Sequence, residues 1–334
     1  MRNLVPIAVA VALVAASCSR SPQPTSSSTV AAINAPIATI KPPDTSVPTS
    51  TQTTTPPTTT SPTTTTTLAA VDVTTARPFE VVVPTSYDGS VAVPLVVLLH
   101  GYTASGALQE VYFKMRPLAE TRGFLYVHPD GTTDIAGNKF WNGTDACCNL
   151  AGAIVDDSAY VAALIANVQR RYKVDPKRIF LVGHSNGGFM SYRMACDHAG
   201  TIAAIASLAG ATFNDSAGCK PSEPVSVLQI HGTADKIISY TGGQILGKTY
   251  PPAAVTASTW AAYNGCKPTG VPSAAALDLE AQLAGAESSI TTFSGCRPGG
   301  SVELWSIDAG AHTPALSPRF ASSVIDFLLA HPKP

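Results

Sequence analysis

Short apolar runs alternate with longer helix-like stretches along residues 94–330, and this alternation constrains the fold more than any other feature. The runs PLVVLLHG (94–101) and FLYVHPDG (124–131) carry consecutive apolar residues bounded by glycine or proline. A strand that is covered on both faces produces such an uninterrupted run. Because helical patterns separate the runs, the sequence predicts a mostly parallel, doubly wound sheet with helices on both faces.

The remaining elements continue this alternation. We expect further strands at 178–183, 201–210, 225–235 and 301–308, helices at 155–176, 186–199, 254–266 and 317–332, and an antiparallel edge strand at 78–84. In a sheet of this kind, active sites lie at the carboxyl ends of the strands.

The first 70 residues differ in composition from the rest. Residues 1–18 place an early arginine, a short apolar run and small residues before Cys18, which is the order of a secretory signal. The sequence AASC further predicts a lipoprotein signal with a lipid on Cys18; a plain secretory signal is the alternative. Residues 19–70 are rich in Thr, Pro and Ser, so we expect a disordered stalk. The protein is thus predicted to be extracellular or at the cell surface.

Residues 71–334 are long enough for a single large α/β domain after that stalk. The net charge is −1 and no long run of lysine or arginine occurs. These features do not favour nucleic-acid binding. We expect a monomer whose membrane contact is limited to the lipid anchor.

The cysteine count is informative because the protein is predicted to be exported. If Cys18 carries lipid, six cysteines remain, and an even number in an oxidising compartment favours disulfides. Proximity along the chain favours two pairings and leaves two adjacent cysteines to pair with each other or stay free: Cys196 with Cys219, Cys266 with Cys296, and Cys147 beside Cys148. The sequence contains no C-x-x-C pair or His/Cys cluster with zinc spacing, so we expect no metal and no cofactor.

Ser185 lies in the sequence GHSNG (183–187), between a predicted strand and a predicted helix. A turn this sharp strains the serine and requires small residues two positions to either side. In return it exposes the hydroxyl at the end of the strand, facing the helix N-terminus. This context favours a nucleophile elbow over a plain Gly/Ser turn.

A serine nucleophile needs a base, and the base needs an acid that orients it. After such an elbow the acid precedes the histidine in the sequence. His312 lies in a loop between a predicted strand and the last helix, and we predict that it is the base. The other downstream histidines are expected to be surface or packed groups: His198, His231 and His331.

Asp235, in the loop after the strand at 225–232, is the predicted acid. Asp308 and Asp215 are the rival acids, and Asp308 is the nearer of the two to His312 in the sequence. Holding a loop is the expected role of Asp308.

The oxyanion of a tetrahedral intermediate requires two backbone N–H donors. The residue after the nucleophile, Asn186, supplies one. We predict that the amide of Tyr102 supplies the other, with Thr103 as the alternative, and that His100 is structural.

These motifs resemble a known family. LLHG, WNGTDACC, VDD, GHSNGG, AAIASLAG, HGTAD and AHT occur in this order over about residues 79–330, and the set is similar to secreted esterases of the polyhydroxybutyrate depolymerase-like family. That family includes feruloyl and acetylxylan esterase-type enzymes. The resemblance implies an α/β-hydrolase fold, with Ser185 as nucleophile, Asp235 as acid and His312 as base.

The chain departs from that family at two places. Members often continue the histidine motif as H-T-W-P-G, whereas this chain reads HTPALS, so an aromatic wall beside the ester is expected to be missing. Many members carry cysteine after HG, where this chain has Tyr102.

The leading hypothesis is an extracellular serine carboxylesterase that forms an acyl-enzyme with esters of polymers or aryl acids. An acyltransferase of the cell envelope with the same triad is the alternative enzyme. An inactive hydrolase fold that serves as a binding module is the alternative outside catalysis. Substrate choice is expected to lie in the segments 103–115, 132–150 and 236–300.

Overall fold

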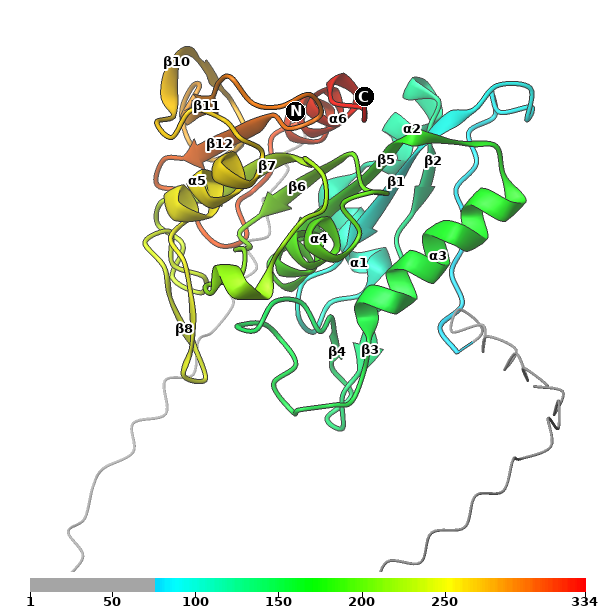
Figure 1. The fold of residues 1–334 in the computed structure, drawn as a ribbon, viewed down its shortest axis with the longest axis horizontal. Coiled ribbons are helices and arrows are strands. Elements are labelled where there is room, and N and C mark those ends of the chain that lie inside the picture. The colour runs from blue at the N-terminus through cyan, green and yellow to red at the C-terminus, as the bar shows by residue number, and fades with distance from the viewer. Residues whose placement is uncertain (1–75) are drawn as a thin grey trace, which may run out of the picture. The chain divides into compact units, whose positions relative to one another are not determined.

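A computed structural model describes residues 76–334 (Figure 1). The predicted signal (1–18), Cys18 and the predicted stalk (19–70) lie outside the described residues. No helix within 76–334 has both the length and the apolar character needed to cross a membrane.

An eight-stranded sheet forms the centre of the fold, with the strand order β10-β11-β12-β7-β6-β5-β1-β2. The strands from β12 to β2 pair in parallel, whereas β10 and β11 pair antiparallel at one edge. The predicted mostly parallel sheet is therefore confirmed. The strands are β1 (Val93–Leu99), β2 (Leu125–Val127), β5 (Val174–His184), β6 (Ala204–Leu208), β7 (Ser226–Gly232), β10 (Val271–Leu277), β11 (Ser288–Phe293) and β12 (Val302–Ile307).

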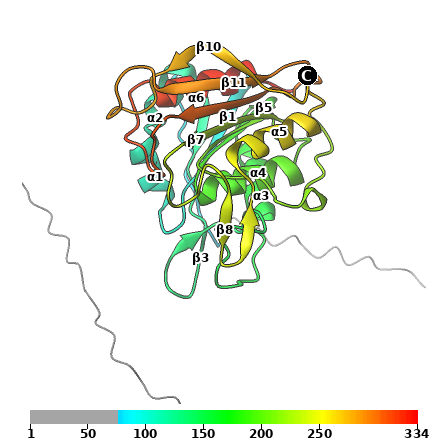
Figure 2. The same cartoon turned by 90° about the vertical axis from the view of Figure 1, so that its left-hand side faces the viewer.

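Helices cover both faces of this sheet, as the sequence predicted (Figures 1 and 2). The helices of one face share a hydrophobic core with the sheet: α3 (Asp157–Arg171), α4 (Asn186–Asp197) and α5 (Ala253–Tyr263). The helices of the other face share a second core: α1 (Gly106–Phe113), α2 (Arg116–Arg122) and α6 (Phe320–Ala330).

Strand β1 shows why the apolar runs are uninterrupted. Leu95, Val97 and Leu99 belong to the core under α3–α5, and Val96 and Leu98 belong to the core under α1, α2 and α6. Successive side chains of a strand point to opposite faces, so a strand covered twice needs apolar residues at every position.

The predicted edge strand at 78–84 is wrong in extent. The segment makes a single antiparallel bridge, between Val82 and Tyr126. Pro78 and Pro84 bracket it and lack the N–H that a ladder requires. The antiparallel edge is β10–β11. The sequence did not predict a strand there, because β10 is built from small, mostly exposed residues without a buried apolar run.

Two hairpins extend the loops at the carboxyl ends of the parallel strands. The first, β3 (Thr132–Thr133) with β4 (Lys139–Phe140), follows β2, and the second, β8 (Gly243–Ile245) with β9 (Lys248–Tyr250), follows β7. Figures 1 and 2 show both hairpins projecting from the same end of the domain. The segments expected to govern substrate choice therefore contain regular structure.

Disulfides tie the loops to the helices. The structure joins Cys196 to Cys219, Cys266 to Cys296, and the neighbouring Cys147 to Cys148. The first pair links the end of α4 to the segment after β6, and the second links the segment after α5 to the segment after β11.

Candidate active site

The backbone turns sharply at Ser185, between the end of β5 and the start of α4. Ser185 has φ 53° and ψ −119°, a region that non-glycine residues rarely adopt. A Cβ on Gly183 would lie 2.1 Å from the carbonyl oxygen of Gly187, and a Cβ on Gly187 would lie 2.0 Å from that of Leu99. Strand and helix approach so closely that only glycine fits at these two positions.

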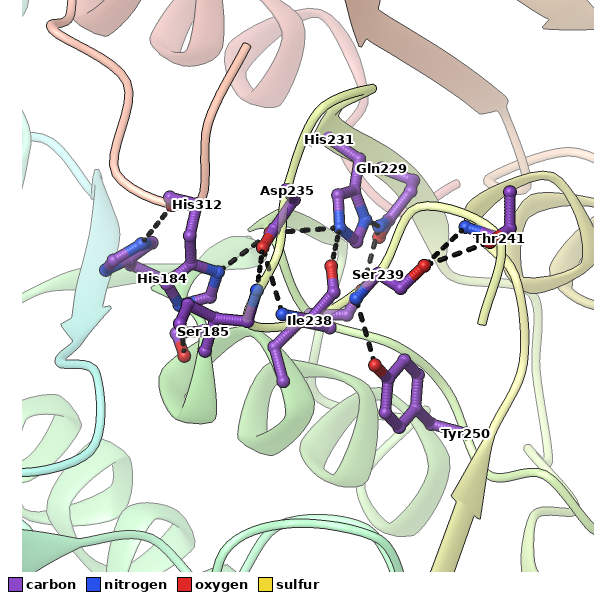
Figure 3. A network of polar contacts seen from close by, with 12 residues as sticks. His184, Ser185, Gln229, His231, Asp235, Ile238, Ser239, Thr241, Tyr250 and His312 are labelled. Atoms are coloured by element: carbon purple, nitrogen blue, oxygen red, sulfur yellow. Dashed lines mark hydrogen bonds and ion pairs between the residues drawn. The ribbon is translucent and has the colours of Figure 1, made fainter. Parts of the chain in front are cut away.

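Three side chains from three separate loops meet at this turn (Figure 3). The Nε2 atom of His312 lies 3.0 Å from the Oγ of Ser185, and its Nδ1 lies 2.8 Å from the Oδ2 of Asp235. A carboxylate only accepts hydrogen bonds, so Nδ1 carries the proton of a neutral ring and Nε2 presents its lone pair to the serine. The arrangement can therefore remove a proton from Ser185.

The loops that carry the acid and the histidine bond directly to each other. The Ala234 amide donates to the Gly310 carbonyl at 3.0 Å. The Thr233 hydroxyl donates to Asp308 at 3.2 Å and accepts from the Ala309 amide at 2.8 Å. Asp308, a rival for the acid, therefore holds these two loops together.

The second rival acid is also engaged elsewhere. Asp215 accepts from the amide of Ala217 at 2.8 Å, at the start of a single 3₁₀ turn (Ser216–Gly218). Within residues 76–334, the carboxylate that accepts from His312 is that of Asp235.

Asp235 is stabilised in its ionised form. Its Oδ1 accepts from the backbone amides of Ile237 and Ile238 at 2.8 and 2.9 Å. Its Oδ2 accepts from His312 and lies 3.3 Å from the Nε2 of His231. Burial by itself raises the pKa of Asp235, but the hydrogen bonds from the two histidines and the Ile237 amide outweigh burial and hold the pKa well below its usual range.

His184, inside the elbow, supports the loop of His312. Its Nε2 donates to the carbonyl oxygen of His312 at 3.0 Å, and the two rings pack with centroids 5.2 Å apart. Burial lowers the pKa of His184 to about 4, even though the hydrogen bond to the carbonyl favours the charged form. Sequence reasoning missed this residue, although an imidazole directly before the nucleophile was a visible signal.

The other histidines have partners of their own. His198 lies 3.0 Å from the hydroxyl of Ser158, and His331 lies 2.6 Å from the carbonyl of Phe327. His231 is buried in β7, with contacts on both ring nitrogens.

The loop after β1 is held from two sides. The buried ring of His100 accepts from the Gly131 amide at 2.9 Å, and Gln109 of α1 accepts from the Gly101 amide at 3.1 Å. His100 is thus a packed group in the turn beneath the predicted oxyanion donor.

The two predicted oxyanion amides remain open. The alternative donor, the Thr103 amide, already donates to the Lys139 carbonyl at 2.9 Å. The side chain of Asn186 bonds both the amide and the carbonyl of Trp141, at 2.7 and 2.8 Å. Across the described part of the chain, the backbone amides of Tyr102 and Asn186 have no hydrogen-bond acceptor assigned to them, so both can face a ligand.

An apolar cluster lies beside this site and draws on α4, on the loops after β1 and β6, and on the segments that carry the two hairpins. It is linked to the elbow because the Nδ2 of Asn186 lies 3.7 Å from the sulfur of Cys147. Its members are Tyr102, Ala146, Cys147, Cys148, Phe189, Ala211, Ile238, Ile245 and Tyr250. An adjoining cavity of about 310 Å³ lies between the 142–150 segment and the β8–β9 hairpin.

Residues 76–334 contain no group of three or more His, Cys, Asp or Glu side chains arranged to hold a metal ion.

Comparisons with known proteins place this site in context. The model of the phospholipase/carboxylesterase family matches residues 86–269. Feruloyl esterase B of Piromyces equi is 30% identical over 237 residues, which are 69% of this chain and 41% of that protein. Feruloyl esterase D of Neurospora crassa is 25% identical over 254 residues, 72% of this chain and 75% of the relative. The chain thus spans about two fifths of the first relative and three quarters of the second.

A solved structure supports the fold. The acetyl xylan esterase from Aspergillus awamori superposes with a TM-score of 0.51 at 16% identity, covering 75% of this chain and 93% of that one. At this identity the likeness concerns the arrangement of helices and strands.

Proposed function

Since the chain belongs to the phospholipase/carboxylesterase family, we propose that it is a serine carboxylesterase that forms an acyl-enzyme on Ser185. One observation carries this proposal: the continuous hydrogen-bonded line from Ser185 through His312 to Asp235. The three residues are the nucleophile, the base and the acid of a triad.

In the first half of the reaction, His312 takes the proton of Ser185 while the serine oxygen attacks the ester carbonyl. The ring then gives that proton to the leaving alcohol as the carbon–oxygen bond breaks. In the second half, His312 takes a proton from water, and the hydroxide attacks the acyl-enzyme. The acid leaves and Ser185 recovers its proton. Asp235 stays ionised throughout and stabilises the imidazolium.

The oxyanion of each tetrahedral intermediate is assigned to the backbone amides of Tyr102 and Asn186. The Asn186 amide lies in the first turn of α4, where the helix dipole adds a favourable field. The amides are preorganised because the side chain of Asn186 is fixed on Trp141 and the amide preceding Tyr102 is held by Gln109.

We assign the substrate to esters of aryl acids, with polyhydroxybutyrate esters as the alternative. The two named relatives are feruloyl esterases, and Ala146, Cys147 and Ile245 of the apolar cluster line the adjoining cavity, where an aromatic acyl group can pack. We place the enzyme outside the cell. Three disulfides and the signal-like residues 1–18 support that location.

Hydrolysis of p-nitrophenyl butyrate by Ser185→Ala tests the proposal, with Ser258→Ala in α5 as the matched control. Ser185→Ala should abolish turnover and labelling by a fluorophosphonate probe, while the control should retain both. Undiminished turnover by Ser185→Ala would refute the assignment. A panel of methyl ferulate, hydroxybutyrate oligomers and acetylated xylan then ranks the substrates.

A further inference from the structure

A polar residue interrupts the apolar run of β7. It begins a buried series of side-chain contacts that ends at the proposed triad. Gln229 is fully buried in the centre of the sheet. Its Oε1 accepts from the Tyr192 hydroxyl at 2.6 Å, and its Nε2 lies 2.8 Å from the Gly210 carbonyl and 3.1 Å from the Nδ1 of His231. Figure 3 shows Gln229, His231 and Asp235 in succession beside His312.

The contacts of Gln229 fix the orientation of its amide. A carbonyl oxygen can only accept, so the amide nitrogen must face Gly210 and the amide oxygen must face Tyr192. The second hydrogen of that nitrogen then points at the Nδ1 of His231. Because a donor faces it, Nδ1 must present a lone pair.

The other ring nitrogen of His231 is equally constrained. Its Nε2 lies 2.7 Å from the carbonyl of Ile238 and 3.3 Å from the Oδ2 of Asp235. Both neighbours only accept, so Nε2 carries the hydrogen. A second proton on Nδ1 would face the amide hydrogen of Gln229. The surroundings therefore select one neutral tautomer.

We propose that His231, locked by Gln229 in its neutral Nε2–H tautomer, is a positioning residue that holds Asp235 in the orientation that receives His312. This inference rests on the proposed function, because it assigns a role toward the acid of that triad. It extends the triad inward along Asp235, His231, Gln229 and Tyr192.

The physical role of the lock follows from the two oxygens of Asp235. Its Oδ1 accepts from the amides of Ile237 and Ile238, and its Oδ2 accepts from His312. His231 of β7 donates to the Ile238 carbonyl and lies 3.3 Å from Oδ2, so its ring supports the peptide that holds Oδ1 and borders Oδ2. The strand thereby fixes the direction in which Oδ2 meets His312. In this tautomer the His231 N–H faces acceptors and its Nδ1 faces the Gln229 donor, so the ring is held in one orientation while His312 becomes charged in the transition state.

The first test measures the tautomer in the full-length wild-type protein. Nitrogen-15 NMR of the imidazole rings should show that Nε2 of His231 carries the proton and that Nδ1 does not, across the pH range of activity. A protonated Nδ1 would overturn the proposal, and this result does not depend on any variant folding.

The second test compares kcat and KM of His231→Phe, His231→Gln and Tyr240→Phe with p-nitrophenyl butyrate. His231→Phe keeps a ring but loses the N–H that holds the Ile238 carbonyl beside Asp235, so its kcat should fall about ten- to hundredfold, the range for a buried polar group left without its partner. Its KM should stay within about twofold. His231→Gln keeps an amide donor and should recover most of the lost kcat.

Tyr240→Phe is the matched control. The Tyr240 ring packs on His231 with centroids 5.7 Å apart. Its hydroxyl bonds Ser306, which does not belong to the series of contacts that leads to Asp235. This variant should keep wild-type kcat. The downfield N–H resonance of His312 with Asp235 should weaken in His231→Phe and persist in Tyr240→Phe.

The outcomes separate the two proposals. Activity in Ser185→Ala would overturn the proposed function itself. A second outcome is that Ser185→Ala loses activity while a folded His231→Phe keeps the wild-type kcat. That outcome would overturn the positioning role of His231 and leave the proposed function standing. Equal losses in His231→Phe and His231→Gln would also overturn it, because an N–H donor at residue 231 would then not matter.

Discussion

Acid should destabilise the fold through His184, and His184→Gln should remove that part of the loss. The His184 side chain is buried and stays neutral, since burial lowers its pKa to about 4 from 6.5. Glutamine does not titrate but keeps a donor for the carbonyl of His312. The variant therefore separates the charge of His184 from its hydrogen bond.

The sign and size of the effect follow from proton linkage. Below pH 6.5 the unfolded chain binds a proton at His184, whereas His184 of the folded protein stays unprotonated until the pH approaches 4. Stability is therefore lost as the pH falls through this window. For these two pKa values, linkage gives a loss of about 2.5 kcal/mol between about pH 7.5 and about pH 4.5.

Other groups do not obscure this difference. The lowered pKa of Asp235 stabilises the fold above its unfolded value of 3.8, so that contribution is still nearly complete at about pH 4.5. Burial also lowers the pKa of His100, but the wild type and the variant share that loss, and it cancels between them.

Urea unfolding at the two pH values, followed by tryptophan fluorescence, measures the effect in the full-length protein. The three tryptophans of the chain are buried and report on the core. The wild type should lose about 2.5 kcal/mol more than His184→Gln. A difference below about 0.5 kcal/mol, the scatter of independent sites, would show that His184 is not held neutral by burial.

Three further predictions concern the elbow, the acid and a disulfide. Gly187→Ala should lower the thermal midpoint strongly and abolish esterase activity, because its Cβ would lie 2.0 Å from a backbone oxygen. A Cβ at Gly200 would lie 4.0 Å from its nearest neighbour, the Oε1 of Glu223, so Gly200→Ala should leave both within error of wild type. Asp235→Asn should reduce kcat by about four orders of magnitude with little change in secondary structure by circular dichroism, and near-normal kcat would contradict its role as the acid. The double variant Cys196→Ala/Cys219→Ala opens a loop with a sequence separation of 23 and should cost about 3 kcal/mol in urea unfolding, and an unchanged midpoint would count against that bond.

Much of the fold could be predicted from the sequence because its signals are local. A strand covered on both faces favours apolar residues at every position; β1 meets that requirement throughout, and β5, β6 and β7 carry shorter apolar runs. The weak signal of β10 shows the converse, since exposed small residues leave no pattern to read. The elbow was also visible, because Gly183 and Gly187 flank Ser185 between an apolar run and a helical pattern.

The choice among distant partners needed the tertiary structure. His312 lies 127 residues from Ser185 and 77 residues from Asp235, and sequence order alone could not exclude Asp308, which is closer along the chain. Likewise, only the hairpin after β2 decides that the Thr103 amide is occupied by Lys139 while that of Tyr102 is open.

Sequence by itself therefore predicted the strained corner at Ser185, because the apolar strand, the two flanking glycines and the helix follow one another along the chain. Only the folded sheet decided that Asp235 is the carboxylate that meets His312, that the Thr103 amide is already occupied, and that the buried imidazole of His231 lies between Gln229 and Asp235. Hydrogen bonds act over about 3 Å, and loops separated by tens of residues come that close only after the parallel strands have brought their carboxyl ends to one edge.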